Sequence, residues 1–514
     1  MRKLWRFHGG VRLPGFKSLS TGSAIQPVTL PGLLVFPLRQ HLGTPAEPVV
    51  NKGDYVYKGQ CIAVSAGYVS APVHASTSGE VVDIGPSVLP HTSRIAEPCI
   101  VIRPDGREAW DPAISPCLKP AEINDEQVRQ TIRDAGIVGL GGAVFPSSVK
   151  LKPTCTTDTL IINGAECEPY ITCDDVLMRE RADAILLGAL VIKRVIQAER
   201  VLVAVEDNKP EAIRSLATRL QKFIDANVQD AASIEIVSIP TVFPTGGEKQ
   251  LIRVLTGKEV PKGGLPYQIG VVCMNVGTSA AVYDAIYDGV PLISRIVTVT
   301  GPDVPRPGNY RVLLGTPIQD VLKAAGVASI DGHELIMGGP MMGQRMPNTE
   351  VPVVKATNCL LLQTTQAQPG PVMPCIRCGA CANACPVNLL PQQLYWHGRA
   401  KNLDKLEQYH LSDCIECGCC AVVCPSHIPL VHYFRFGKSA IADRDASRER
   451  AFQSRVRNEA RLARIERIRV EQERRKAARK ASRSSGKART ADTAKVPVAG
   501  EVGGKETCRE QAEA

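Results

Sequence analysis

Hydrophobic and polar residues follow different patterns in successive parts of the chain. Up to about residue 115, short apolar runs are separated by Gly and Pro, which is typical of short strands. From about 116 to 290, apolar runs rich in Val and Ile alternate with segments whose apolar residues recur at helical spacing. The expected strands lie at 160–163, 201–205 and 234–239, and the expected helices at 182–197 and 211–226. This βαβ order predicts a mainly parallel sheet, whose carboxyl ends are the natural ligand site.

The rest of the chain has two further patterns. Residues from about 295 to 355 predict a small strand-rich unit, with a strand at 309–312 and a helix through Val321 and Leu322. Residues 448–480 mix Arg, Glu and Ala with few large apolar residues, which favours a solvent-exposed helix over a membrane-bound one. Beyond Ala481, Ser, Gly, Lys and Thr dominate, and disorder is expected.

Composition narrows the class of protein. A chain of 514 residues is too long for one core, so several domains are expected. Its start lacks the apolar core of a signal peptide, and its longest apolar run, 184–192, is too short to span a bilayer. Any membrane association should therefore be peripheral. The net charge of +10 draws heavily on the C-terminal region, where no aromatic residues interleave the basic ones, so no nucleic acid partner is expected.

Two cysteine runs carry the strongest chemical signal. Both have the spacing C-x2-C-x2-C-x3-C-P, the ligand pattern of a bacterial two-cluster ferredoxin. In that pattern three close thiolates hold one cubane, and the fourth crosses to the other. One [4Fe–4S] cluster is thus expected on Cys375, Cys378, Cys381 and Cys424, and the second on Cys414, Cys417, Cys420 and Cys385.

Structural zinc is the main alternative, because thiolates separated by two residues also suit tetrahedral zinc. Two complete copies, each with a third thiolate and a Cys-Pro ending, exceed what zinc needs. Cys419 lies off the spacing and is expected to be a buried thiol. Half of the 18 cysteines lie between 375 and 424 and the others have no pairing logic, which excludes a disulfide framework and indicates a reducing compartment.

A glycine-rich loop precedes the first strand of the parallel sheet. Residues 139–146 read GLGGAVFP, and Lys150 follows. Closely spaced glycines let backbone amides approach a phosphate, and a nearby lysine supplies a point charge. The glycine spacing fits neither the dinucleotide fingerprint nor the Walker loop. On this loop alone, a plain tight turn is favoured over a phosphate site.

The loop and the next strand end together resemble the flavin-bearing subunit of respiratory complex I, which binds FMN and NADH. That family has a loop of the form GRGGAGFP followed by a lysine, and a strand end of the form NADESEP, where residues 163–169 read NGAECEP. The matching positions are Gly139, Gly141, Gly142, Phe145, Pro146 and Lys150, then Asn163, Glu166, Glu168 and Pro169. The resemblance implies that the glycines and Lys150 hold the FMN phosphate region and that Asn163 and Glu166 contact the flavin. It also implies that Glu168 faces the nicotinamide nucleotide.

Two later segments resemble the same family. GGEK at 246–249 falls where the family has Gly-Glu-Glu, and NVGT at 275–278 resembles its Asn-Asn-Val-Glu-Thr segment. The cofactor-binding residues that carry over are Gly247, Glu248, Asn275 and Thr278. Lys249 replaces the second glutamate of the family and Leu140 its loop arginine. FMN as a cofactor and NAD(H) as a substrate are implied.

Other segments resemble known modules. The N-terminal part is similar to the barrel-sandwich fold of biotinyl and lipoyl carriers, but 66–69 offers no lysine for a swinging arm. The unit after the flavin domain resembles a soluble-ligand-binding β-grasp module. The resulting fold class is multidomain α/β and α+β. The expected domains are a non-carrier barrel-sandwich hybrid (1–115), a Rossmann-like FMN/NADH-binding domain (116–290), a β-grasp module (291–360), a two-[4Fe–4S] ferredoxin domain (361–438) and a helical, disordered basic tail (439–514).

This order resembles the RnfC (RsxC) family of the Rnf (Rsx) electron transport complex over about residues 1–440. The resemblance implies a peripheral subunit on the cytoplasmic side of the bacterial inner membrane, in an ion-translocating complex that moves electrons between NADH and ferredoxin. The partners implied are the other subunits of that complex, NADH, and ferredoxin or another iron–sulfur acceptor. No side chain is expected to be catalytic by itself, because the chemistry belongs to the cofactors. The alternative is a non-catalytic relay and docking protein that uses only its clusters, and Lys249 is the residue that supports it.

Overall fold

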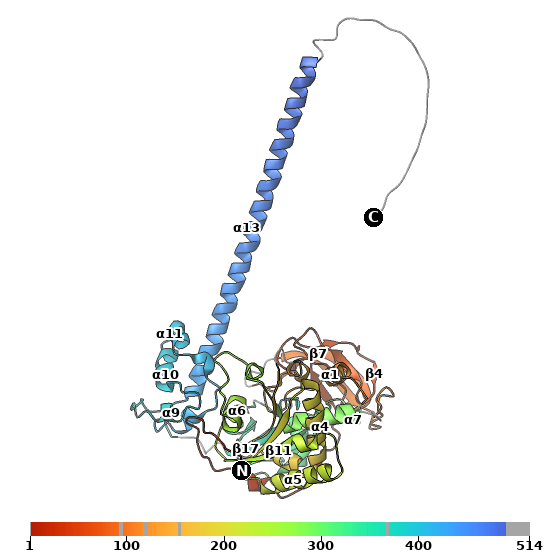
Figure 1. The fold of residues 1–514 in the computed structure, drawn as a ribbon, viewed down its shortest axis with the longest axis vertical. Helices are drawn as coiled ribbons and strands as arrows, with labels where there is room; N and C mark the ends of the chain where they lie inside the picture. The colour runs from red at the N-terminus through yellow and green to blue at the C-terminus, as the bar shows by residue number, and fades with distance from the viewer. Residues whose placement is uncertain are drawn as a thin grey trace. The chain divides into compact units, whose positions relative to one another are not determined.

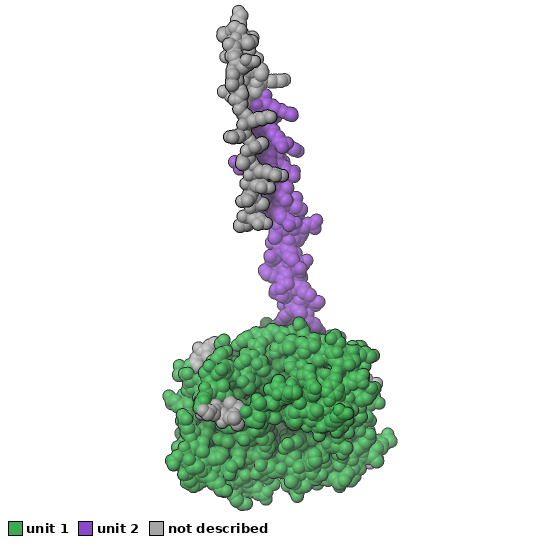
Figure 2. Space-filling view, turned by 90° about the vertical axis from the view of Figure 1, so that its right-hand side faces the viewer, with its two compact units in different colours: residues 1–438 green, residues 439–514 purple. Residues whose placement is uncertain are grey.

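The computed structural model describes residues 2–91, 96–116, 122–152, 156–346, 348–364 and 370–489. The chain forms two compact units, residues 1–438 and 439–514, which Figure 2 shows in different colours. The first unit contains all the sheets and every predicted site residue. Figure 1 gives the element labels used below.

The N-terminal part folds into two small antiparallel sheets. One has the strand order β2 (Leu34–Pro37), β8 (Ala96–Pro104), β7 (Gly79–Val88) and β4 (Tyr55–Val56), and the other β3 (Glu47–Pro48), β5 (Cys61–Val64) and β6 (Val73–His74). Phe36, Ile62 and Ile100 are fully buried within this part. Between β5 and β6, at the tip where a carrier would hold its lysine, Tyr68 is exposed. The barrel sandwich therefore serves as a packing module.

A parallel sheet forms the centre of the predicted flavin domain, with the strand order β11 (Ile234–Ile239), β10 (Arg200–Glu206), β9 (Thr159–Gly164) and β12 (Val271–Asn275). The predicted strands and the two predicted helices, now α4 (Ala182–Ile196) and α5 (Pro210–Asp225), are confirmed. The other helices of this part are α1 (Asp125–Asp134), α2 (Ser147–Lys150), α3 (Cys173–Glu180), α6 (Glu248–Thr256) and α7 (Val276–Tyr287). Helices α4 and α7 touch at Gly188, where a Cβ would lie 1.9 Å from the Ser279 carbonyl oxygen. This contact fixes α7, and with it the strand end at Asn275.

A mixed six-stranded sheet follows. Its strand order is β1 (Gln26–Pro27), β14 (Gly308–Leu313), β13 (Ser294–Thr300), β17 (Cys359–Thr364), β15 (His333–Met337) and β16 (Gln344–Arg345), with helix α8 (Ile318–Ala324). The strand expected at 309–312 and the helix through Val321 and Leu322 are confirmed. Strand β1 comes from the N-terminal segment and pairs in parallel with β14 at Tyr310 and Arg311. Two residues carry too little pattern to be read as a strand, so this pairing was not predicted.

The cysteine-rich part is a structural repeat of turns and short helices. Its helices are α9 (Ala380–Asn383), α10 (Pro391–Arg399), α11 (Leu403–Gln408), α12 (Cys419–Val422) and the start of α13 (Leu430–Arg489). Arg377 and Glu416 occupy equivalent positions in the two runs and have φ values of 58° and 57°. Gly379 and Gly418, which precede α9 and α12, have φ values of 79° and 81°. The repeated spacing thus produces a repeated backbone.

The second unit is helical as far as Arg489. The expected exposed helix over 448–480 is confirmed, because every side chain in that range is exposed. Disorder directly after Ala481 was wrong for residues 482–489, since Ala, Lys and Arg favour the helix and extending an existing helix costs little. The tail after 489 lies outside the described residues. Over the ranges that the structure describes, no helix combines the length and apolar character needed to cross a bilayer.

Candidate flavin and iron–sulfur sites

Two strand ends bring the predicted flavin residues together. Strands β9 and β12 are neighbours in register, and Asn163 pairs with Asn275. Asn275 also caps helix α7, where its Oδ1 accepts from the Gly277 amide at 2.8 Å. One turn along that helix, the buried Thr278 hydroxyl oxygen accepts from the Leu140 amide at 2.9 Å. The carboxyl edge of the sheet and the glycine loop therefore form one site.

The glycine loop is closed on itself by backbone hydrogen bonds. The Gly139 amide donates to the Phe145 carbonyl at 2.8 Å, and the Val144 amide donates to the Gly139 carbonyl at 3.0 Å. Gly142 has a φ of +100° and faces open space, whereas a Cβ at Gly141 would lie 3.3 Å from the Asn275 Cβ. A left-handed residue without a side chain leaves the loop's backbone open to an approaching ligand. The loop thus suits a phosphate-bearing cofactor.

Charged and polar groups complete this edge. Lys150 Nζ lies 2.5 Å from Glu248 Oε1 and donates to the Cys273 carbonyl at 3.1 Å. The Lys150 and Glu248 side chains are 34% and 36% exposed, so both are accessible to a ligand. Gly247 caps helix α6 directly before Glu248, and Asn163 Nδ2 donates to the Gly246 carbonyl at 2.9 Å. Three predicted segments therefore converge around Lys150.

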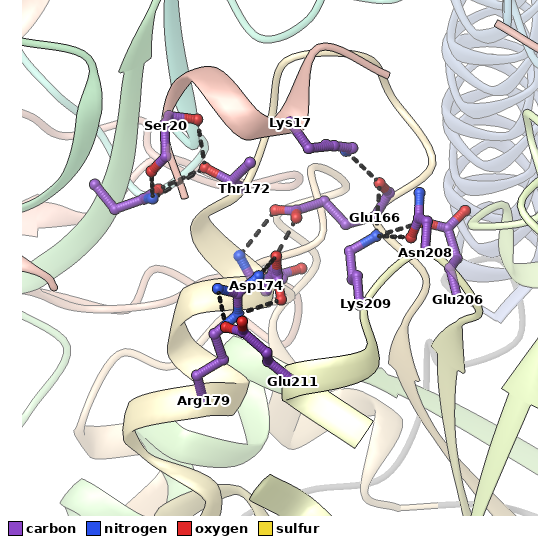
Figure 3. A network of polar contacts seen from close by, with 12 residues as sticks. Lys17, Ser20, Glu166, Thr172, Asp174, Arg179, Glu206, Asn208, Lys209 and Glu211 are labelled. Atoms are coloured by element: carbon purple, nitrogen blue, oxygen red, sulfur yellow. Dashed lines mark hydrogen bonds and ion pairs between the residues drawn. The ribbon is translucent and has the colours of Figure 1, made fainter. Parts of the chain in front are cut away.

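Glu166 has a different orientation. Its buried carboxylate accepts from the Asp174 amide at 2.8 Å and the Asp175 amide at 3.4 Å, both in the first turn of α3. Burial raises the pKa of Glu166 to about 7. Asp174 joins this group to the strand edge, because Asn275 Nδ2 donates to its carboxylate at 2.7 Å. Glu166 anchors helix α3 within the network drawn in Figure 3, and its flavin contact stays a prediction.

Glu168 is the predicted residue that the structure places apart from the glycine loop. Its Oε1 accepts from the backbone amides of Met341 and Met342 at 2.7 and 2.9 Å. A Cβ on Gly339 would lie 2.0 Å from the Glu168 Cγ. Burial raises the pKa of Glu168. The glutamate thus joins the flavin domain to the 338–343 loop of the β-grasp sheet, and its role toward nicotinamide also stays a prediction.

Several members of the polar network in Figure 3 had no sequence signal. Lys209 Nζ donates to Glu206 Oε2 at 2.5 Å, and both side chains are fully buried. Burial opposes the charge on Lys209, but Glu206 outweighs it and the pKa of Lys209 is raised. Lys17, from the N-terminal segment, donates to backbone carbonyls of the 166–171 loop. Both lysines are distant in sequence from the loop, so no spacing pattern could reveal them.

The eight predicted cluster cysteines surround two cavities. The first cavity is lined by Cys375, Cys378, Cys381 and Cys424, together with apolar residues such as Ile428 and Leu430. The second is lined by Cys385, Cys414, Cys417 and Cys420, together with Leu394 and Phe434. The structure therefore groups the thiols with the predicted crossing. Four convergent thiols in an apolar shell fit a cubane cluster.

The second cavity adjoins the flavin segments. Buried Phe243, Ala384, Cys417 and Cys419 form one packed cluster of side chains, against which Cys167 and Met341 also pack. Cys419 is fully buried, as predicted. The Cys167 sulfur accepts from the Gly246 amide at 3.3 Å, which ties this cluster to the 246–249 segment.

The N-terminal segment braces this junction. Val11 and Phe243 exchange two backbone hydrogen bonds of 2.8 and 2.9 Å, and the Gly10 amide donates to the Ala384 carbonyl at 3.0 Å. Gly9 has a φ of +68°, and a Cβ there would lie 2.7 Å from the Ala384 backbone. Glycine is thus required at this position, because the segment lies directly on the backbone beside Cys385.

The fold and these two kinds of site define an iron–sulfur flavoprotein built for electron transfer. Four family models match successive parts of the chain: the RnfC barrel sandwich hybrid domain at 5–107, the Nuo51 FMN-binding domain at 132–284, the SLBB domain at 296–345 and the 4Fe-4S dicluster domain at 374–428. These matches confirm the predicted fold class. The cofactors of the chain are accordingly FMN and two [4Fe–4S] clusters. The domain boundaries stay predictions.

Similar proteins are known over most of the chain. A Pseudomonas aeruginosa protein, named as the subunit designated C of an ion-translocating oxidoreductase complex, is 48% identical over 93% of this chain and 61% of its own length. A Haemophilus influenzae protein of the same name is 46% identical over 90% of this chain and 69% of its own length. Among solved structures, a chain of an NAD+-reducing [NiFe]-hydrogenase has a TM-score of 0.46 at 21% identity, covering 58% of this chain and 59% of that one.

The chain belongs to the RnfC family of ion-translocating oxidoreductase complexes. The predicted family is thereby confirmed. The chain spans 61% of the length of the Pseudomonas relative and 56% of that of a second Haemophilus influenzae relative.

Proposed function

We propose that this chain carries electrons between NAD(H), FMN and two [4Fe–4S] clusters as part of an ion-translocating membrane complex. Bound FMN exchanges a hydride with a nicotinamide and single electrons with clusters. The observation that carries the proposal is the packed contact between the flavin segments and the second cysteine cavity. Cys167 and Phe243, from the flavin domain, touch the same side-chain cluster as Cys417.

The chain's own residues have distinct tasks in this proposal. The open glycine loop and Lys150 hold the phosphate region of FMN, and Asn163, Asn275 and Glu248 line the strand edge beside it. Electrostatics and positioning supply the protein's contribution. The cluster ligands are the two groups of four cysteines that line the two cavities.

The first cavity is the expected exit to a partner. Cys378 is exposed, and the apolar side chains of Val372, Met373 and Ile376 are 61%, 54% and 68% exposed. Exposed apolar groups beside a cluster suit a protein contact that excludes water from the transfer path. The proposed partners are the other subunits of the complex and ferredoxin or another iron–sulfur acceptor. The proposed location is the cytoplasmic face of the bacterial inner membrane, as a peripheral subunit.

An anaerobic NADH titration of the cluster-reconstituted chain tests the proposal. We expect loss of flavin absorbance together with a reduced-cluster signal in low-temperature electron paramagnetic resonance. Lys150→Ala should lose FMN, whereas Lys249→Ala, at a neighbouring exposed position, is the matched control. If dithionite reduces the clusters but NADH leaves wild-type flavin and clusters oxidised, the relay and docking function replaces the NADH-linked one.

A further inference from the structure

The N-terminal segment 15–20 lies directly against the loop that carries Glu166 and Glu168. The Tyr170 amide donates to the Gly15 carbonyl at 2.8 Å. The Phe16 ring stacks on the Tyr170 ring with centroids 4.7 Å apart and planes at 15°. These contacts join two segments separated by about 150 positions in the sequence, so the loop owes its shape to a distant part of the chain.

Lys17 is the centre of this contact. Its ammonium donates to the carbonyls of Glu166, Glu168 and Ile171 at 2.6, 2.7 and 2.6 Å. A lysine has three N–H donors and no acceptor, so all of its hydrogen-bonding capacity serves this one loop. Figure 3 shows the side chain reaching from its helical turn toward Glu166. The three carbonyls belong to residues that surround the left-handed Tyr170, whose φ is 71°.

The charge on Lys17 differs in kind from that on its neighbour Lys209. Lys209 forms an ion pair with Glu206, and its ammonium also approaches the Glu166 carbonyl at 3.4 Å. Within the described ranges, Lys17 forms no ion pair with a carboxylate and bonds only to backbone carbonyls. Burial lowers the pKa of Lys17, and the nearby Glu166 opposes that change. The positive charge of Lys17 is therefore not cancelled by a direct partner.

We propose that Lys17 is a positioning residue of the flavin site, which fixes the 166–171 loop and places a positive charge that favours reduced over oxidised FMN. The inference rests on the proposed function, since it assigns this loop to the flavin. Reduced FMN carries more negative charge than oxidised FMN, and an uncancelled cation in a partly buried site attracts it. The loop-fixing part concerns the apoprotein and can be measured without any cofactor.

Amide hydrogen exchange of the apoprotein tests the first part. Lys17→Met keeps the length of the side chain but removes the charge and the donors. We expect peptides covering 166–172 to exchange about tenfold faster or more, because opening a segment held by charged hydrogen bonds becomes easier. Lys258→Met, at a half-exposed lysine paired with Asp158, is the matched control and should exchange like the wild type. Unchanged exchange in Lys17→Met would overturn the positioning role.

The redox preference is the readout that a purely structural role would not move. In Lys17→Met, we expect the affinity for reduced FMN to fall about tenfold more than that for oxidised FMN, which lowers the two-electron potential by about 30 mV. Lys17→Arg retains the charge and should keep most of the potential even where its loop exchanges faster. Equal weakening of both redox states refutes the electrostatic part. A wild-type chain that binds no FMN refutes the proposed function instead, and the exchange data still decide the role of Lys17.

Discussion

The ligand crossing in the cysteine-rich part leads to a sharp prediction. Cys385 follows Cys381 closely in sequence, yet it lines the cavity of Cys414, Cys417 and Cys420. Each cavity has four thiols, and each cubane needs four thiolates. Cys385→Ala should therefore remove the second cluster and leave the first intact. Bound iron should fall by about half, from about eight to about four atoms per chain.

Double variants separate the crossing from a grouping by sequence. Cys385→Ala combined with Cys417→Ala damages one cavity twice, so iron should remain near four atoms. Cys385→Ala combined with Cys378→Ala damages both cavities, so iron should fall close to zero. Iron is measured with a chelator after acid release, and spin is counted by paramagnetic resonance after dithionite reduction. Cys419→Ala is the control that should keep all its iron. The reverse pattern in the two double variants would refute the crossing.

Three further outcomes follow from the site. Lys150→Ala should raise the dissociation constant for FMN at least tenfold, because a hydrogen bond to a charged phosphate contributes roughly 1.5–3 kcal/mol; fluorescence quenching measures it, and unchanged affinity contradicts the phosphate role. The pKa of Glu166 is raised by burial from 4.5 to about 7, so its stabilising protonation is complete below pH 4.5 and is lost as the pH rises through 7. The apoprotein's melting temperature should fall over that window less in Glu166→Gln than in the wild type, and equal slopes would count against this. Cys419→Ala should make the second cluster's potential more negative at unchanged iron content, because the Cys419 thiol hydrogen-bonds to the Cys417 sulfur; an identical potential in redox titration would exclude that contact.

Some features were readable from the chain because they are local. The strands at 160–163 and 234–239 follow from runs of buried Val and Ile, and both exist. The carboxyl edge of the sheet was expected to collect ligand residues, and the pairing of Asn163 with Asn275 places both there. In contrast, the helix after Ala481 continues to Arg489, because composition indicates weak packing but does not decide where a helix ends.

Other features needed contacts between distant segments. The carboxylate of Glu166 turns to helix α3 and that of Glu168 to the 338–343 loop, although a motif names both only as site residues. Lys17 was not a candidate, because a single lysine in a turn has no pattern.

The sequence by itself determined the chemistry of this protein: eight cysteines at cluster spacing, a glycine loop and the strand ends that accompany it. Spacing of a few residues is a covalent constraint, so it survives without knowledge of the fold. The tertiary structure alone decided which cysteines share a cavity, how the flavin segments reach Cys417, and that the N-terminal segment holds the 166–171 loop. Those relations depend on packing and hydrogen bonds between residues far apart in the chain, which no local pattern encodes.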